Sequence, residues 1–303
     1  MKNKYFIFLL IIISVLGFST DIKVGCVNSK YKTIQEALNN AKIGDTIILE
    51  KGTYRENVII TKDVNIKGED DVLIQPKNND KSVFKIYDSS NVNISNIKIT
   101  SPGTGINIIN AGVHLNNVEI YSSKDAIFGY LFNNDFSMEN SKLSGKTKKS
   151  ENGKEIYISN SGIHLFRNNM TTIKNNKISD YANAIIISTS MHTESKIINN
   201  SIKYCVNGVV FLGDINSNIF DNEIINIYNY AVSLNGKIYA DIEDNKIDSE
   251  NYNLFLNDGK TCLCSKMIFS GKIVGKNNVI IKNEDLLGKY TLPNNFYIIK
   301  NAF

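Results

Sequence analysis

The sequence has no tryptophan, three histidines, four cysteines and little excess of either charge, with a net charge of +4. It holds no cluster of Lys and Arg large enough for a nucleic-acid surface, so we expect no nucleic-acid partner. Apolar residues make up 42% of the chain and charged residues 21%, which allows a large core and excludes wholesale disorder. With 303 residues, the chain has room for one or two domains or for one elongated all-β repeat.

Only one apolar run is long enough to suggest a targeting segment. It covers residues 5–18, after two lysines, and is too short to span a bilayer, which takes about 20 residues. It fits the apolar part of a signal peptide, and we expect cleavage near Ser19 or Thr20. An uncleaved anchor is the alternative. No second apolar segment follows, so we expect a secreted, periplasmic or cell-surface chain with no stable membrane span after cleavage.

The four cysteines are Cys26, Cys205, Cys262 and Cys264. An even number in an exported chain allows disulfides, but the sequence does not determine their pairing. Cys262 and Cys264 lie closer together than the cysteines of a CxxC motif, and no histidine lies nearby. We therefore expect no zinc site.

Asparagine is unusually abundant, with 44 residues, and its positions repeat along the chain. One column of Asn or Asp recurs at spacings of 21, 23, 35, 24, 22 and 23 residues. An Ile, Leu or Met lies two residues before each member, and an Ile or Leu lies three residues after it. The column consists of Asn96, Asn117, Asn140, Asn175, Asn199, Asp221 and Asp244.

This repeat predicts an all-β fold, a right-handed parallel β-helix (solenoid) of about ten coils of about 22 residues. Alternation of apolar and polar residues turns Ile, Leu and Val inward, and only stacked coils bury them. The aligned Asn side chains predict a ladder of amides at the turns. The alternative is a sandwich of unrelated strands. It is disfavoured because the repeats stay in phase across three columns.

The segment Thr33-Ile-Gln-Glu36 is a capping box, followed by apolar residues on one helical face. It predicts a short helix that closes the N-terminal end of the core, with Thr46–Leu49 as the first strand. The one long spacing of the Asn column, 35 residues between Asn140 and Asn175, predicts a polar surface insertion at residues 145–157. We expect the domain organisation to be a signal peptide at 1–20, an N-terminal cap and first coil at 21–57, repeats at 58–285 and a C-terminal cap at 286–303.

Four segments resemble the opening of pectin-lyase-like β-helix proteins, above all the entry block of pectin methylesterases: residues 31–38, 43–47, 51–58 and 65–68. The later coils, with Asn and then Ile three residues on, resemble the repeats of carbohydrate-processing proteins and of the periplasmic NosD family. The resemblance covers residues 30–285 and implies the fold. It leaves the function open, because this fold hosts lyases, hydrolases, esterases, epimerases, adhesins and non-enzymes.

Asp125-Ala-Ile-Phe-Gly129 is similar to the Asp-Phe-Ile-Phe-Gly motif of the esterases, whose aspartate is the nucleophile. That chemistry needs a second carboxylate, an orienting Arg and Gln side chains for the oxyanion. The upstream partner motif with Gln and Asp is missing, because that stretch reads Ser101-Pro-Gly-Thr-Gly105. The sequence therefore disfavours a carbohydrate esterase, and we expect Glu56 of the entry block to be structural.

The catalytic candidates are His164, Arg167, Asp180 and Asp214, in neighbouring coils. His164 lies between apolar residues and should point outward from a strand, while the others fall in turns. Lyase chemistry would use a basic residue together with acids that hold a Ca²⁺ against the sugar carboxylate. Ca²⁺ is the one cofactor this suggests, and the sequence identifies no metal ligands. The alternative is that each of these side chains is solvated surface.

One outward column is unexpectedly apolar for a solvent-facing surface. The insertion or the tail could cover it, or it could bind a ligand or partner. It consists of Asn107, Phe128, His164, Ile186, Val210, Ser233 and Phe255.

Together these features favour an exported, monomeric β-helix protein that binds or processes an extracellular polysaccharide or cell-surface glycan. If catalytic, it would be a lyase or a glycosidase of acidic sugars, and an inverting glycosidase would hold two acids about 6.5–9.5 Å apart. Two alternatives stay open. One is a non-catalytic surface protein, adhesin-like or a structural rod, and the other is a NosD-like periplasmic accessory protein.

Overall fold

The computed structural model describes residues 19–25, 29–150, 155–257, 267–273, 278–281 and 297–298. The predicted signal peptide up to residue 18, Cys26, Cys262, Cys264 and nearly all of the predicted C-terminal cap lie outside the described residues. The chain forms a β-solenoid of about 10 turns with one short helix near its N-terminus. Its 21-stranded main sheet contains parallel pairings, as the sequence repeat predicts.

The elements of the N-terminal half are the helix α2 (Ile34–Asn40) and twelve short or long strands. The strands are β1 (Asp21–Val24), β2 (Thr46–Leu49), β3 (Gly52–Arg55), β4 (Val58–Ile60), β5 (Asn65–Gly68), β6 (Val72–Gln75), β7 (Phe84–Ser101), β8 (Ile106–Ser122), β9 (Ile127–Tyr130), β10 (Phe136–Glu139), β11 (Lys142–Ser144) and β12 (Thr147–Lys149).

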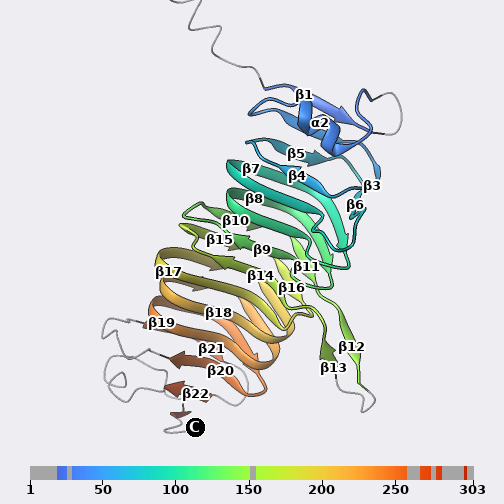
Figure 1. Ribbon diagram of the computed structural model, residues 1–303. Helices are drawn as coiled ribbons and strands as arrows, with labels where there is room; N and C mark the ends of the chain where they lie inside the picture. Colours follow the sequence, from blue (N-terminus) through green and yellow to red (C-terminus); the bar gives the residue numbers. More distant parts are fainter. Residues whose placement is uncertain are drawn as a thin grey trace, which may run out of the picture.

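The elements of the C-terminal half are strands. They are β13 (Glu155–Tyr157), β14 (Ser161–Phe166), β15 (Met170–Lys174), β16 (Lys177–Ser179), β17 (Asn183–Ile198), β18 (Ser201–Phe220), β19 (Glu223–Ser249), β20 (Tyr252–Asn257), β21 (Met267–Ile273), β22 (Asn278–Ile281) and β23 (Tyr297–Ile298). The coils stack from β1 at one end of the rod to β22 at the other (Figure 1).

The pairing register divides each coil into three faces, which we call faces A, B and C in chain order. In one coil, face A is β9, face B is β10 and face C is β11. Each pairs in register with the same face of the next coil, as β14 does with β9, β15 with β10 and β16 with β11. Longer strands such as β18 run through a corner from one face to the next.

The core is a column of apolar side chains inside the coils. The strands alternate in burial, and the inward positions of β9 and β10 are fully buried. The Ile and Leu residues that follow the Asn column by three positions are at most 2% exposed, which confirms the predicted inward direction. This dense packing of branched side chains repeats in every coil, so adjacent coils share one continuous core.

The Asn and Asp column lies at the corner between faces B and C. All seven of its members have a positive φ, between 51° and 59°, a conformation that Asn and Asp tolerate better than other side chains. Their amides also join along the rod: Asn117 Nδ2 donates to Asn96 Oδ1 at 2.9 Å, and Asn199 Nδ2 donates to Asn175 Oδ1 at 2.8 Å. The predicted ladder is confirmed at these positions.

A second ladder, which the sequence analysis missed, lies one residue further on and inside the rod. Asn176, Asn200, Asn222 and Asn245 are all at most 2% exposed. The backbone N–H and Nδ2 of each of the first three donate to Oδ1 of the next, at 2.9–3.1 Å. Buried amides with partners on both sides satisfy the backbone of the corner.

The N-terminal cap forms as expected, with one correction. Helix α2 buries Ile34, Ala37 and Leu38, and its N-cap Thr33 accepts a hydrogen bond from the Glu36 N–H. The expectation that Thr46–Leu49 is the first strand is wrong, because β1 precedes it and pairs with it in parallel. The polar–apolar alternation before the helix covers only the four residues of β1, which is too few to predict a strand from the sequence.

Glu56 is structural, as predicted, and its role is specific. Its Oε1 accepts from the Ile34 N–H at 2.8 Å and its Oε2 from the Gln35 N–H at 3.1 Å. These donors lie in the first turn of α2, where N–H groups have no partner within the helix. The carboxylate therefore joins the cap to the first coils.

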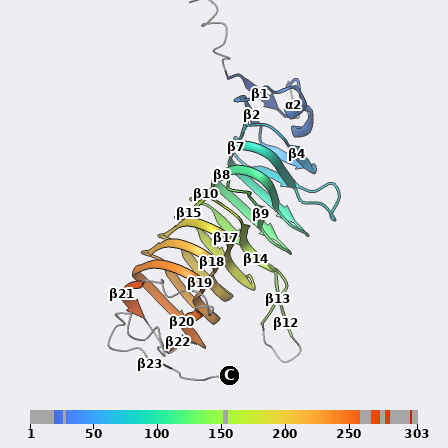
Figure 2. The same ribbon diagram turned by 60° about the vertical axis from the view of Figure 1, so that its left-hand side comes forward.

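The predicted insertion is an antiparallel hairpin of β12 and β13, which pair with each other in a separate sheet. It leaves the solenoid after face C and stands away from the rod (Figures 1 and 2). Its base is fastened by the Lys146 N–H, which donates to Ser159 Oγ at 2.7 Å.

Candidate functional site

Five rings contact one another on the outside of face A, and we call them the aromatic cluster: Phe128, Tyr130, Phe132, His164 and Phe166. The outward positions of β9 and β14 supply four of them, because alternate residues of a strand point the same way. The parallel register places His164 beside Phe128 and Phe166 beside Tyr130.

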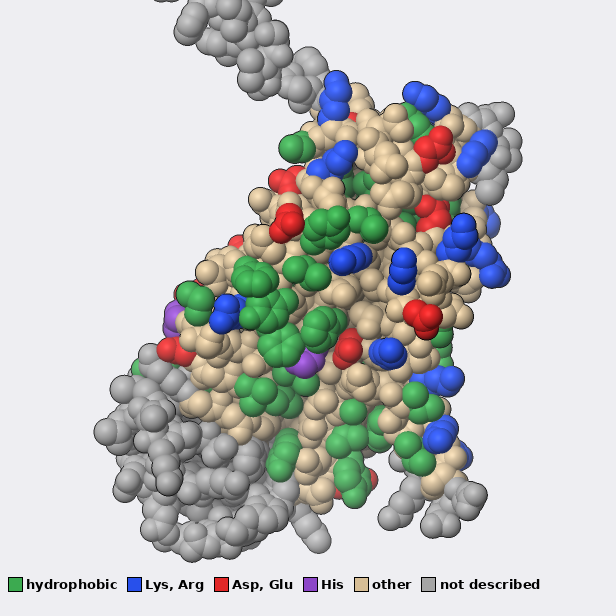
Figure 3. Space-filling view, in the orientation of Figure 1, with side chains coloured by type: hydrophobic (Ala, Val, Ile, Leu, Met, Phe, Trp, Pro, Cys, Tyr) green, Lys and Arg blue, Asp and Glu red, His purple; other side chains and the backbone are tan. Residues whose placement is uncertain are grey.

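The rings of the aromatic cluster pack closely. The His164 ring lies 4.3 Å from that of Phe166 and 5.5 Å from that of Phe128, centroid to centroid. Tyr130 stacks on Phe166 at 5.9 Å and contacts Phe132 at 4.5 Å. In Figure 3 hydrophobic side chains gather in the middle of the visible face, with a histidine beside an acidic side chain at the edge of the patch.

Arg167 adds a positive charge to the aromatic cluster. Its guanidinium carbon lies 5.7 Å from the centre of the Tyr130 ring, within cation–π distance. The residue is at the corner after β14 and has a φ of 48°, so the chain turns there. The cluster thus combines apolar ring faces with a planar donor that suits carboxylates.

Asp125 and His164 influence each other at the edge of the aromatic cluster. Burial raises the pKa of the Asp125 carboxyl above its usual value, although His164 and hydrogen bonds from Ser161 and Asn160 act against this. Burial also lowers the pKa of the His164 imidazole, and the Asp125 charge acts against that shift. Each pKa shift favours the neutral form of its group. A neutral carboxyl beside a neutral imidazole is suited to proton transfer, whereas a fixed ion pair is not.

Two buried oxygen atoms beside the aromatic cluster have no hydrogen-bond partner among the described residues: Asp125 Oδ1 and Asn107 Oδ1. Asn107 pairs in register with Phe128, and Asp125 precedes β9 by two residues. Buried acceptors are rarely left unpaired. Both atoms lie beneath the surface, so each adds a local cost of unpaired burial beside the cluster.

The four residues predicted from sequence do not form one cluster. His164 and Arg167 both join the aromatic cluster, through Phe166 and Tyr130. Asp180 follows face C with a φ of 69° and accepts from Ser179 Oγ at 2.5 Å.

Asp214 lies at the corner between faces A and B, two coils beyond Arg167. Its Oδ1 is 3.0 Å from Nδ1 of His192, and the two side chains are 28% and 56% exposed. This pair is a solvent-facing contact.

The apolar outward column of face A has the predicted register, from Asn107 through Phe128, His164 and Ile186 to Val210. These five residues are each partly exposed. The hairpin strands β12 and β13 stand away from the stack of coils (Figure 2). Tyr130 and Phe166 were not predicted from the sequence, although both lie two residues after a member of the column and share its direction.

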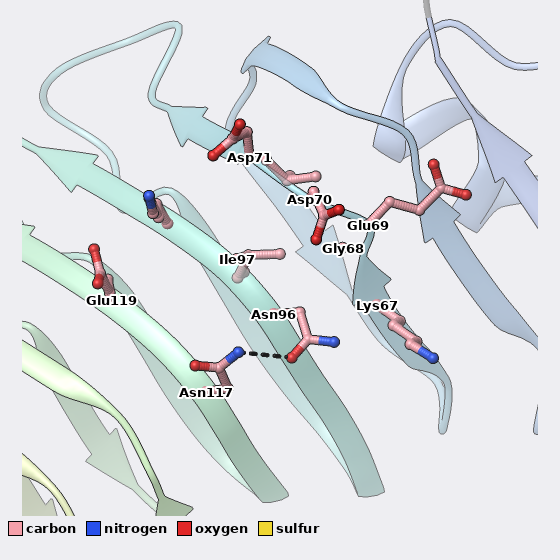
Figure 4. A pocket seen from close by; sticks show the side chains of 11 residues that line it. Lys67, Gly68, Glu69, Asp70, Asp71, Asn96, Ile97, Asn117 and Glu119 are labelled. Carbon is pink, nitrogen blue, oxygen red and sulfur yellow. Dashed lines mark hydrogen bonds between the residues drawn. The ribbon is translucent and has the colours of Figure 1, made fainter.

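A cavity of about 440 Å³ lies elsewhere, over β5, β7 and β8 (Figure 4). Glu69, Asp70, Asp71 and Glu119 line it together with two lysines. Figure 4 shows these carboxylates spread around the cavity without a common centre. Within the described ranges, no group of three or more His, Cys, Asp or Glu side chains could hold a metal ion.

Comparison with known proteins identifies the architecture. The chain matches no protein-family model and no curated protein sequence. It is similar to polygalacturonase from Erwinia carotovora ssp. carotovora, with 11% identity, a TM-score of 0.52 and coverage of 88% of this chain and 89% of that one. It is also similar to XylC in complex with xylose, with 10% identity, a TM-score of 0.51 and coverage of 82% and 72%.

The chain therefore has the right-handed parallel β-helix fold of pectin-lyase-like proteins. The likeness at this identity establishes the fold and not the reaction. Among the described residues, no helix has the length and apolar character needed to cross a membrane.

Proposed function

We propose that this protein binds an extracellular acidic polysaccharide on face A, over the aromatic cluster. The observation that carries this proposal is the continuous, partly exposed set of rings with Arg167 at its edge. Sugar rings have apolar faces that pack on aromatic side chains, while their hydroxyls need hydrogen-bond partners. A guanidinium forms paired hydrogen bonds with a carboxylate, as an acidic sugar would offer.

The outward column of face A extends this surface beyond the aromatic cluster. The partly exposed Ile186 and Val210 continue the same column along the rod. An extended chain molecule fits such a linear surface better than a compact ligand does.

Two further observations support a glycan outside the cell. The polygalacturonase and the xylose-bound protein with the same fold carry names that refer to sugars. The apolar run at residues 5–18 has the pattern of an export signal. We therefore propose that the chain is exported and meets its glycan there.

The test is calorimetric titration of the protein with polygalacturonate, alginate and neutral dextran. We expect binding of an acidic polymer, a tenfold or greater loss of affinity in Phe166→Ala, and a loss restricted to acidic polymers in Arg167→Gln. Tyr121→Ala, at a residue 43% exposed on face C, is the matched control and should bind normally. A folded wild-type protein that binds none of the polymers would overturn the proposal and favour a structural rod.

A second candidate function is cleavage of the same glycan by β-elimination, and the Asp125–His164 pair favours it. Neutral His164 would take the proton next to the sugar carboxylate, and that electron pair would form a carbon–carbon double bond. The neighbouring glycosidic C–O bond would break, and the leaving oxygen would take a proton from Asp125.

This second candidate has its own readout. We expect the ultraviolet absorbance of an unsaturated sugar to rise with wild-type protein, and neither His164→Ala nor Asp125→Asn should produce it. The assay is run with and without Ca²⁺, because the sequence analysis named that ion. Binding without any new absorbance or reducing ends would exclude cleavage and leave the binding function.

A further inference from the structure

A second cavity, of about 960 Å³, lies at the corner between faces C and A, far along the rod from the acidic cavity of Figure 4. We call it the tyrosine groove. Three tyrosines line it: Tyr157 from the hairpin strand β13, Tyr204 from β18 and Tyr228 from β19. The solenoid and the hairpin thus both contribute to it.

The backbone presents these rings to solvent. Tyr204 has a φ of 55°, a conformation that is uncommon for a bulky side chain. Tyr204 is 51% exposed and Tyr228 is 55% exposed, so two large rings on adjacent coils stay open to solvent. Exposed aromatic residues that line a cavity are typical of binding surfaces.

The charge of the tyrosine groove has one sign. Asp248 and Glu250 line it, and none of the lining residues that the structure describes is Lys, Arg or His. The nearest lysine in sequence, Lys203, makes an ion pair with Glu223, which also binds Lys246. The groove therefore offers carboxylates and ring faces to a cation, whereas the aromatic cluster offers Arg167 to an anion.

We propose that the tyrosine groove binds an amino sugar with a free, protonated amine, such as a glucosamine unit of a glycan. Ring faces and carboxylates together attract an ammonium group, through cation–π and charge-assisted contacts. The open shape and the volume suit rigid sugar rings that carry the amine directly. A lone lysine side chain, with its flexible stem, would need a more enclosed cage.

The test compares two four-sugar oligomers that differ only in the amine: the free glucosamine tetramer and its fully N-acetylated form. Acetylation removes the positive charge and keeps the rings. By titration calorimetry we expect the free amine to bind wild-type protein at least tenfold more tightly. We expect a similar loss of affinity in Glu250→Gln and in Tyr204→Ala.

Two variants serve as controls. Glu119→Gln removes an acid from the other cavity, and Phe166→Ala alters the aromatic cluster; both should bind the glucosamine tetramer like wild type. Equal affinity for the two tetramers would overturn the proposal. So would tighter binding of tetralysine than of the glucosamine tetramer, which would identify a basic peptide as the ligand. Because Phe166 lies outside the tyrosine groove, this result is independent of the function proposed for face A.

Discussion

Single residues of this protein combine a backbone role with a side-chain role. Asn199 takes up a left-handed turn with a φ of 52° and also donates along the rod to Asn175. Asp125 and His164 are similar. Their backbones bond to neighbouring coils, and their side chains lie at the aromatic cluster. The chemistry of such residues depends on burial, which changes their proton affinities from the values in water.

The pKa of His164 provides a direct prediction. Burial lowers it below the ordinary value of 6.5, while the Asp125 charge partly restores it. Asp125→Asn removes that charge, so we expect the His164 pKa to fall further and the imidazole to stay neutral to lower pH. Titration of the imidazole signals by NMR checks this. A rise in the His164 pKa in this variant would contradict the prediction.

Cys205 should be chemically inert in the folded protein. It is fully buried, and burial raises the pKa of its thiol to about 12, so almost no thiolate forms at neutral pH. We expect no reaction with a soluble disulfide reagent until denaturant is added. In a variant with the other three cysteines replaced by serine, one thiol should react only after unfolding. Rapid labelling of that variant in buffer would show that the coil opens locally.

At the scale of elements, the corner between faces B and C holds a continuous buried polar network. The faces bond through backbone pairings, while the corner between faces B and C carries the buried ladder from Asn176 to Asn245. Each side-chain amide there bonds backbone groups of the preceding coil, as Asn200 does with the N–H of Asn176 and the carbonyl of Ile173. A gap in this ladder leaves buried donors and acceptors unpaired, which is costly.

Asn200→Ala tests the ladder. The change removes an Oδ1 that accepts from Asn176 and an Nδ2 that donates to the Ile173 carbonyl at 2.9 Å. With about 1–3 kcal/mol for each buried group left unpaired, we expect a loss of about 3 kcal/mol in the free energy of unfolding. Denaturant titration measures it. The adjacent Asn199→Gly keeps the left-handed turn and should cost less than about 1 kcal/mol; equal losses would refute the ladder's role.

At the scale of the whole molecule, the rod is nearly one-dimensional, since each coil contacts mainly its neighbours. Stability then depends on both ends being closed, because an open end exposes unpaired strand edges and apolar core. At the N-terminal end, α2 packs on β1, β2 and β4 and covers the core. The hairpin β12–β13, in contrast, lies outside the stack.

Glu56→Ala tests the closure of the N-terminal end. Loss of the acceptors for Ile34 and Gln35 should release α2 at a cost of about 1–2 kcal/mol, as for other helix caps. We expect hydrogen exchange to speed up in β1, β2 and β5 and to stay unchanged in β17 and β18. Exchange followed by mass spectrometry resolves these segments. Uniform acceleration along the rod would show that the coils unfold as one unit.

Much of the fold follows from local pattern. The Asn column, the inward Ile and Leu and the helix at Thr33 are repeated or local signals, and each is confirmed. The candidate site is harder to predict from the sequence. His164 and Arg167 were found because they are rare residue types at outward positions, whereas Tyr130 and Phe166 are common residues whose meaning arises only when coils stack.

The sequence by itself determined the coil, because a period of about 22 residues with apolar positions in phase allows few other ways to bury them. Only the tertiary structure decided which side chains meet. The register that places Phe166 beside Tyr130, and the hairpin that carries Tyr157 to the tyrosine groove, join residues far apart in the chain. Such contacts depend on how the coils stack and on the path of the hairpin, and the period of the repeat alone specifies neither.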